Sequence, residues 1–163
     1  MTEPGEMSAV IDARDETEIC PIALSLDVLG QKWTILIVRE ALRGARRFSE
    51  FHEALGCPRN LLAARLRLLC DSGVLRLVPY AVPGQRTREQ YELTPAGEEL
   101  APTLIALFDW GTRHTSVGDA MWAQPSRCAC GAQLHVALEC EAGHRLTTPE
   151  TIVFPRRSVA RAS

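Results

Sequence analysis

Residues 47–71 read RFSEFHEALGCPRNLLAARLRLLCD, and this stretch decides the fold. Phe48 opens a predicted helix of about two turns that ends at Leu55-Gly56, because glycine readily terminates a helix. Cys57-Pro58 then separates this helix from the next, since proline lacks the N–H that a continuing helix needs. A second helix is predicted from about Arg59 to Asp71. The order is therefore helix, tight break, helix.

The second of these helices has two unlike faces. Leu62, Leu66 and Leu69 recur at helical spacing and are predicted to face the core. The opposite side carries arginines together with small or amide side chains: Arg59, Asn60, Ala63, Ala64 and Arg67. One face of this helix is thus expected to pack and the other to remain polar and accessible.

The flanking sequence completes the order of elements. Helices are predicted for about 20–29 and for Trp33 up to Gly44. Strands are predicted for 74–78 and 89–93, joined by a basic turn, and a long helix for 96–114. This order predicts a winged helix-turn-helix, a mainly α fold with a small β wing (α+β). Such folds commonly place a helix in the DNA major groove.

The distribution of charge supports that interpretation. The 163-residue chain has a net charge of −2, but residues 31–94 hold eleven Lys and Arg against six acids. A local basic surface is what neutralises phosphates, and the total charge does not decide it. A solvated face with no partner would show the same local excess, so the charge alone leaves both interpretations open.

Candidate base contacts lie in the N-terminal part of the second helix. Arginine can bind guanine in two-point fashion and asparagine can bind adenine, so Arg59 and Asn60 are expected to meet base edges. Ala63 and Ala64 allow the backbone to approach the duplex. Arg67 lies further along and is expected to meet phosphate.

Candidate backbone contacts come from two other places. Arg86 and Arg88 lie near the tip of the wing, where side chains enter the minor groove or bind phosphates. Arg46 and Arg47 precede the first helix and are expected to clamp the DNA backbone. Ser49 is expected to be the N-cap of that helix, with its hydroxyl available to a phosphate.

Several short motifs occur together between residues 20 and 114. They are Cys20-Pro21-Ile22, Gly30-Gln31-Lys32-Trp33-Thr34, Arg47-Phe48-Ser49-Glu50, Leu62-Ala63-Ala64-Arg65-Leu66, Tyr91-Glu92-Leu93-Thr94-Pro95-Ala96-Gly97 and Trp110-Gly111. In combination they resemble the HxlR-type family of bacterial winged helix-turn-helix transcriptional regulators, within the MarR-like superfamily. Two positions depart from the family pattern: Pro58 stands where a Ser or Thr cap is usual, and the wing is slightly longer.

The resemblance implies a homodimeric repressor or activator that binds an inverted repeat in double-stranded DNA. The family pairs through its first and last helices, which correspond here to about 20–29 and 96–114. The apolar residues expected at that interface are Ile22, Leu26, Leu100, Leu104, Leu107 and Phe108. A small-molecule or oxidant effector is a further implied partner.

Cys20 occupies the position of a cysteine that some HxlR-type regulators use to sense oxidants or electrophiles. A helix N-terminus favours the negatively charged thiolate, which is the reactive form. The alternative is an inert cysteine packed in the dimer interface, and the sequence leaves both open.

The C-terminal part contains a cluster of soft metal ligands. Cys128, Cys130, Cys140 and His144 could form a closed structural zinc site, with His135 as an alternative to His144. The ligand spacing is irregular, because one residue separates the first pair and three residues separate the second. A reduced, metal-free tail is the other interpretation.

The sequence predicts a flexible acidic arm (1–18), the DNA-binding and dimerisation domain (19–118), the Cys-rich tail (126–155) and a disordered end (156–163). The acidic N-terminus is unlike a signal peptide, and no apolar run approaches the ~20 residues of a membrane span, so the cytoplasm is the expected location. No enzymatic motif is found. The alternative function is a protein-interaction adaptor with a winged-helix docking module and a zinc-stabilised tail.

Overall fold

The computed structural model describes residues 20–81, 87–115 and 126–146. The predicted arm (1–18), Arg86 of the predicted wing tip and the predicted disordered end (156–163) lie outside the described residues. The chain divides into two compact units, one up to Leu104 and one from Ile105 onward, and each is described by itself.

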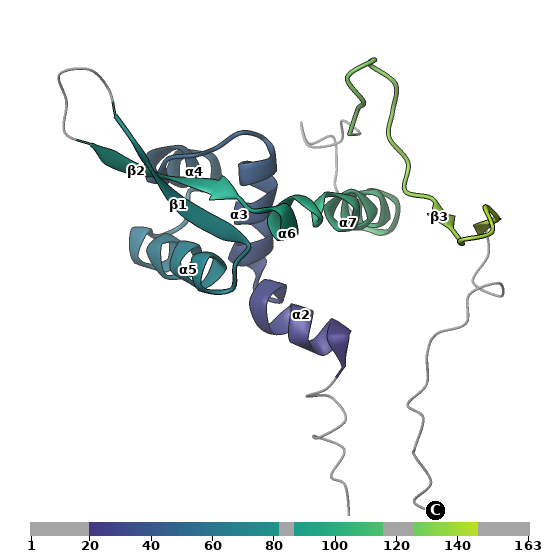
Figure 1. Ribbon diagram of the computed structural model, residues 1–163, viewed down its shortest axis with the longest axis horizontal. Helices are drawn as coiled ribbons and strands as arrows, with labels where there is room; N and C mark the ends of the chain where they lie inside the picture. Colours follow the sequence, from purple (N-terminus) through teal and green to yellow (C-terminus); the bar gives the residue numbers. More distant parts are fainter. Residues whose placement is uncertain (1–19, 82–86, 116–125, 147–163) are drawn as a thin grey trace, which may run out of the picture. The chain divides into compact units, whose positions relative to one another are not determined.

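The first unit follows the predicted order of elements closely (Figure 1). Its elements are α2 (Pro21–Leu29), α3 (Lys32–Leu42), α4 (Phe48–Leu55), α5 (Arg59–Asp71), β1 (Leu75–Tyr80), β2 (Arg88–Leu93) and α6 (Pro95–Glu98). Helix α7 (Ala101–His114) begins in this unit and continues into the second. The winged helix-turn-helix fold is confirmed.

The core forms where α5 packs against α3, α4 and β1. Leu62, Leu66 and Leu69 of α5 are fully buried, as their spacing predicts, together with Ile37 of α3 and Phe51 of α4. Each such side chain contributes ~1.5–3 kcal/mol when it is removed from water. Burial of the three leucines therefore fixes the rotation of α5 about its own axis.

The wing is an antiparallel hairpin whose register runs from Leu75 opposite Leu93 to Tyr80 opposite Arg88. Its base is fixed by the Thr94 hydroxyl, which donates to the Gly73 carbonyl oxygen (2.6 Å) and accepts from the Gly97 N–H (3.2 Å). Gly97 lies so close to the Val74 carbonyl that a Cβ atom there would clash. Thr94 and Gly97 thus join the wing to the helix that follows it.

The prediction of a single helix for 96–114 is wrong in one respect, because the chain forms two helices there, α6 and α7. Pro102 lies in the first turn of α7 and has no N–H to donate to the carbonyl of Glu98. The helix therefore stops after Glu98 and restarts at Ala101.

In the second unit, the described residues beyond α7 form short strands. Leu138–Glu139 (β3) pairs with Arg145–Leu146 (β4), and Arg127 forms an isolated bridge with Gln133. Across residues 20–81, 87–115 and 126–146, no single helix is long and apolar enough to cross a membrane. The pair α2 and α3 meets that criterion only when combined across a bend of 81°.

Candidate nucleic-acid interface

The polar face of α5 is accessible in the protomer. Arg59, Asn60, Ala64 and Arg67 are exposed and Ala63 is half-buried, whereas the leucines of the same helix are fully buried. The first turn of α5 directly follows the break at Cys57-Pro58. The residues predicted to meet base edges therefore lie on the exposed side.

An aromatic ring orders Arg59 at the start of α5. The guanidinium carbon of Arg59 lies 5.8 Å from the centroid of the Phe48 ring, within the range of a cation–π contact. Phe48 is the first residue of α4, and its ring stacks on His52 one turn later. The N-terminal ends of α4 and α5 are therefore close together.

A second arginine–aromatic contact joins α4 to the wing. The guanidinium carbon of Arg47 lies 4.8 Å from the centroid of the Tyr80 ring, and Tyr80 pairs with Arg88 across the hairpin. Arg47 and Arg88 are both exposed. We call Arg47, Arg59, Arg67 and Arg88 the basic surface. Neither Phe48 nor Tyr80 was identified from the sequence as part of this site, because both contacts join separate elements.

Arg46 has a structural role beside this surface. Its carbonyl oxygen accepts a hydrogen bond from the Tyr91 N–H (2.7 Å), and its guanidinium donates to the Ala41 carbonyl (3.3 Å). The loop before α4 is thereby attached to both β2 and α3.

Tyr91 is half-buried, and burial raises the pKa of its phenol while nearby Arg67 opposes that rise.

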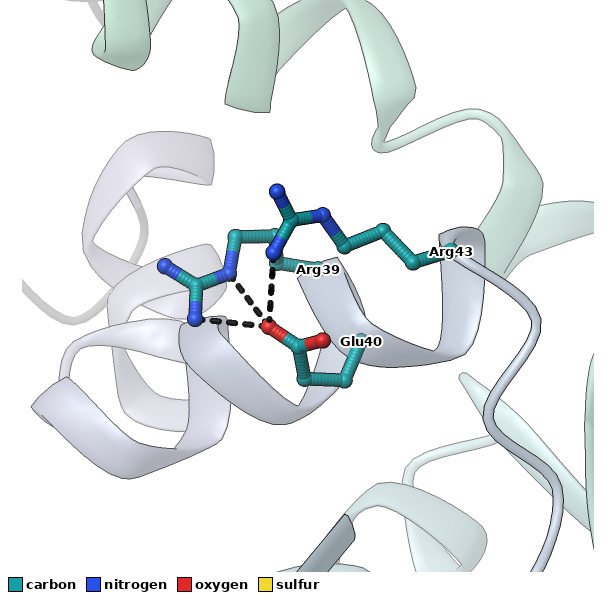
Figure 2. A network of polar contacts seen from close by, with 3 residues as sticks. All are labelled: Arg39, Glu40 and Arg43. Carbon is teal, nitrogen blue, oxygen red and sulfur yellow. Dashed lines mark hydrogen bonds and ion pairs between the residues drawn. The ribbon is translucent and has the colours of Figure 1, made fainter. Parts of the chain in front are cut away.

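Arg39 and Arg43, two further arginines of the basic segment 31–94, neutralise the buried carboxylate of Glu40, as Figure 2 shows. Glu40 is only 6% exposed, and its Oε1 atom lies 2.6 Å from Arg39 Nη2 and 3.4 Å from Arg43 Nη1. A buried charge is costly unless it is paired, so these arginines stabilise α3. They were not among the predicted contacts to DNA.

The N-terminus of α4 is capped differently from the prediction. Ser49 is not the N-cap: the N-cap residue is Arg47, and Ser49 lies exposed inside the first turn. Instead, Glu50 Oε2 accepts hydrogen bonds from the N–H groups of Arg46 (2.7 Å) and Arg47 (2.9 Å). A carboxylate at the third helical position can reach back over the end of the helix in this way, and Glu50 takes this role. These backbone hydrogen bonds hold the pKa of Glu50 below its usual value.

The residues predicted for dimerisation fall into two groups. Ile22 and Leu26 of α2 are exposed, as is Leu107 of α7. Leu100 and Leu104 are half-buried and pack against the core of their own protomer. Phe108 is half-buried.

Cys20 is the half-buried N-cap residue of α2, and its carbonyl accepts from the Leu24 N–H (2.9 Å).

The predicted metal ligands lie in two separate pairs. In one pair, Cys140 Sγ and His144 Nδ1 are 3.5 Å apart. In the other, hydrogen bonds from the backbone N–H of Cys130 and, to a smaller extent, from its side chain lower the pKa of the Cys128 thiol. Among the residues that the structure describes, no three potential ligands gather at one point. His135 is exposed and lies apart from the Cys140–His144 pair in the sequence.

Sequence relatives share most of the chain. The family profile described as HxlR-like helix-turn-helix matches residues 28–119. The HTH-type transcriptional regulator Rv3095 of Mycobacterium tuberculosis is 33% identical over 147 residues, which cover 87% of this chain and 92% of that protein. The HTH-type transcriptional regulator sll1512 of Synechocystis is 36% identical over 113 residues, 69% of this chain and 76% of that protein.

Solved structures agree with the sequence relatives. PA1607, described as a candidate transcription factor, is 34% identical with a TM-score of 0.69 and covers 85% of this chain and 96% of its own. The reduced form of the redox regulator HypR is 29% identical with a TM-score of 0.51 and covers 58% of this chain and 92% of its own.

The cap at α4 generates a prediction about pH. Replacing Glu50 with alanine removes an acceptor for two N–H groups and should cost ~1 kcal/mol of unfolding free energy at neutral pH, reduced by solvent because the side chain is 42% exposed. Since the folded state lowers the pKa of Glu50, the stabilisation is present above the carboxyl's unfolded pKa and is lost as pH falls through the folded value. Urea denaturation from neutral to acidic pH should show wild type and Glu50→Ala converging. The exposed Glu53→Ala of the same helix is the control, and a pH-independent difference for Glu50→Ala would contradict the assignment.

Proposed function

Because the chain belongs to the HxlR-like helix-turn-helix family and is a transcriptional regulator rather than an enzyme, we propose that it binds an inverted-repeat operator in double-stranded DNA as a homodimer. The observation that carries this proposal is the exposed side of α5. Arg59 and Asn60 stand in its first turn with their side chains exposed. Base contacts in helix-turn-helix proteins come mainly from this part of the second helix.

The basic surface supplies the contacts that position the protein. Arg47, Arg67 and Arg88 come from the start of α4, the middle of α5 and the wing. These arginines would bind phosphates, which fix the register of a protein on DNA without reading sequence. Exposed Ser49 remains a candidate phosphate contact through its hydroxyl, and Arg86, outside the described residues, remains a candidate from the sequence.

Dimerisation is supported by apolar side chains that the protomer leaves in water. Ile22 is 66% exposed, and Leu24 and Leu26 of the same helix are exposed as well. In α7, Leu107 and Trp110 are 53% and 56% exposed. Clusters of exposed large apolar residues mark interaction surfaces. A two-fold dimer through α2 and α7 would present two copies of α5 to half-sites ~34 Å apart.

Cys20 is proposed as the point at which oxidants act on the dimer. It is the N-cap residue of α2, next to the exposed apolar side chains of that helix. HypR, which is similar to this chain, is described as a redox regulator. A disulfide between the Cys20 residues of two subunits, formed by loss of two hydrogens to an oxidant, would change how the protomers pair.

The α5 contacts predict separate effects on specificity and on overall affinity. Arg59→Ala and Asn60→Ala should each lower discrimination between an operator and random DNA by ~1–3 kcal/mol. Arg88→Ala should weaken both kinds of DNA alike and reduce the salt slope by about one. Fluorescence anisotropy over a salt series, with a site selected from a random duplex library, measures both quantities.

Arg145→Ala is the charge-matched control, because Arg145 is exposed in the tail and faces Glu139. Unchanged discrimination in the Arg59 and Asn60 variants would exclude α5 as the element that reads bases. Binding that does not fall with salt would favour a protein-docking role for the wing instead.

The dimer proposal predicts that Ile22→Asp and Leu107→Asp each yield a monomer, since an unpaired charge would be buried at the interface. Sedimentation velocity reports the association state, and far-UV circular dichroism confirms that each variant is folded. Leu77→Asp is the matched control, because Leu77 is 46% exposed but lies on β1. A wild-type chain that sediments as a monomer at micromolar concentration would refute the dimer.

The sensor proposal predicts that diamide changes the operator affinity of the wild type by at least about fivefold and that Cys20→Ser abolishes this response. Non-reducing electrophoresis should show a cross-linked dimer only when Cys20 is present. Cys70→Ser should behave as wild type, since Cys70 is a half-buried residue at the end of α5. Wild-type affinity that diamide leaves unchanged would eliminate Cys20 as a sensor.

A further inference from the structure

The tail contains two hairpin turns of the same construction. In the first, Cys128 N–H donates to the Ala132 carbonyl (2.8 Å) and Gly131 N–H donates to the Cys128 carbonyl (2.8 Å). In the second, Cys140 N–H donates to the His144 carbonyl (3.1 Å) and Gly143 N–H donates to the Cys140 carbonyl (2.8 Å). Each is a three-residue loop that ends in a left-handed glycine, a common hairpin geometry.

The two glycines make these turns possible. Gly131 has a φ of 86° and Gly143 a φ of 80°, a region that other residues rarely adopt. Each turn also begins with a cysteine and carries a second soft metal ligand within the next four residues. Such a repeat of both backbone geometry and ligand chemistry is not needed for a simple surface loop.

The distance within the second turn matches a metal site. Cys140 Sγ and His144 Nδ1 are 3.5 Å apart. With Zn–S of about 2.3 Å and Zn–N of about 2.0 Å, tetrahedral geometry sets the S···N separation at about 3.5 Å. A thiol–imidazole hydrogen bond can have the same length, so this distance alone does not decide between the two.

The described residues of the tail bury few side chains, and their hairpins rest on backbone hydrogen bonds and the exposed Arg145–Glu139 ion pair. Between 126 and 146 only Ser126, Leu134 and Leu146 are half-buried, and the remaining side chains are exposed. All six cysteines of the chain are free, so no disulfide closes the tail. Units below about 40 residues usually need a disulfide, a metal or a partner to hold a fold.

We propose that Cys128, Cys130, Cys140 and His144 bind one Zn²⁺ in a closed structural site that joins the two hairpins. Each turn supplies a pair of ligands, and the site requires residues 133–139 to bring the two pairs together, since they are separate among the described residues. Binding releases three thiol protons to solvent and changes no oxidation state. The metal supplies folding free energy that the tail's small apolar area does not.

His144 is the fourth ligand in this proposal, and His135 is not. His144 closes the second turn and its Nδ1 faces Cys140 Sγ. The three residues between Cys140 and His144 also match a common ligand spacing. His135 lies in the connecting segment, where no cysteine is hydrogen-bonded to it in the described tail.

Metal analysis of the full-length chain, expressed with zinc and purified under a thiol reductant, tests the proposal. Wild type should retain about one equivalent of zinc, whereas Cys128→Ser, Cys140→Ser and His144→Ala should retain less than about a tenth. Cys70→Ser and His135→Ala are the matched controls and should retain the wild-type amount. Wild-type protein reconstituted with Co²⁺ should show the visible absorption of a tetrahedral thiolate site.

Less than about a tenth of an equivalent of zinc in the wild type, or a cobalt spectrum without thiolate bands, overturns the site. Full retention by Cys128→Ser does the same. Loss in His135→Ala with retention in His144→Ala overturns the ligand assignment. Metal content is measured without DNA, so these outcomes are independent of operator binding.

Discussion

Burial of the leucine face of α5 is the constraint on which the rest of the structure depends. Leu62, Leu66 and Leu69 have no exposed surface, and together they contribute several kcal/mol, ~1.5–3 for each side chain. Rotating α5 by one residue position would expose at least one of them. The hydrophobic core thus sets which side chains face solvent, and Arg59 and Asn60 are accessible because the leucines are not.

Aromatic rings order two of the arginines around this face. Arg59 lies over Phe48 and Arg47 over Tyr80, so α5, α4 and the wing are joined through contacts to uncharged rings. Arg47 also lies 3.9 Å from Glu50 Oε1, but both side chains are largely exposed and solvent screens this long ion pair. Cation–π contacts reduce the entropy that an arginine loses on binding, and they preserve its attraction for phosphate.

Local patterns were enough to predict most elements and the exposed side of α5, because helical periodicity and chain breakers act within a few residues. They failed where the outcome depended on competition or on distant contacts. Ser49 looked like the N-cap, but the Glu50 carboxylate makes two hydrogen bonds there and the helix starts earlier. The Arg47–Tyr80 contact joins residues far apart in sequence, and no local pattern encodes it.

Several arginines of the basic segment 31–94 are paired with carboxylates, so the number of basic residues there exceeds the positive charge available to a ligand. Glu40 is buried, and its carboxylate requires Arg39 and Arg43, so these two cations stabilise α3 (Figure 2). Arg76 likewise pairs with Glu92 across the wing (3.1 Å). Among the described residues of the basic segment, these three arginines are thus less available to a polyanion than the exposed Arg59, Arg67 and Arg88. An overall charge of −2 is compatible with DNA binding because the local distribution of charge, and not the total, decides the attraction for phosphates.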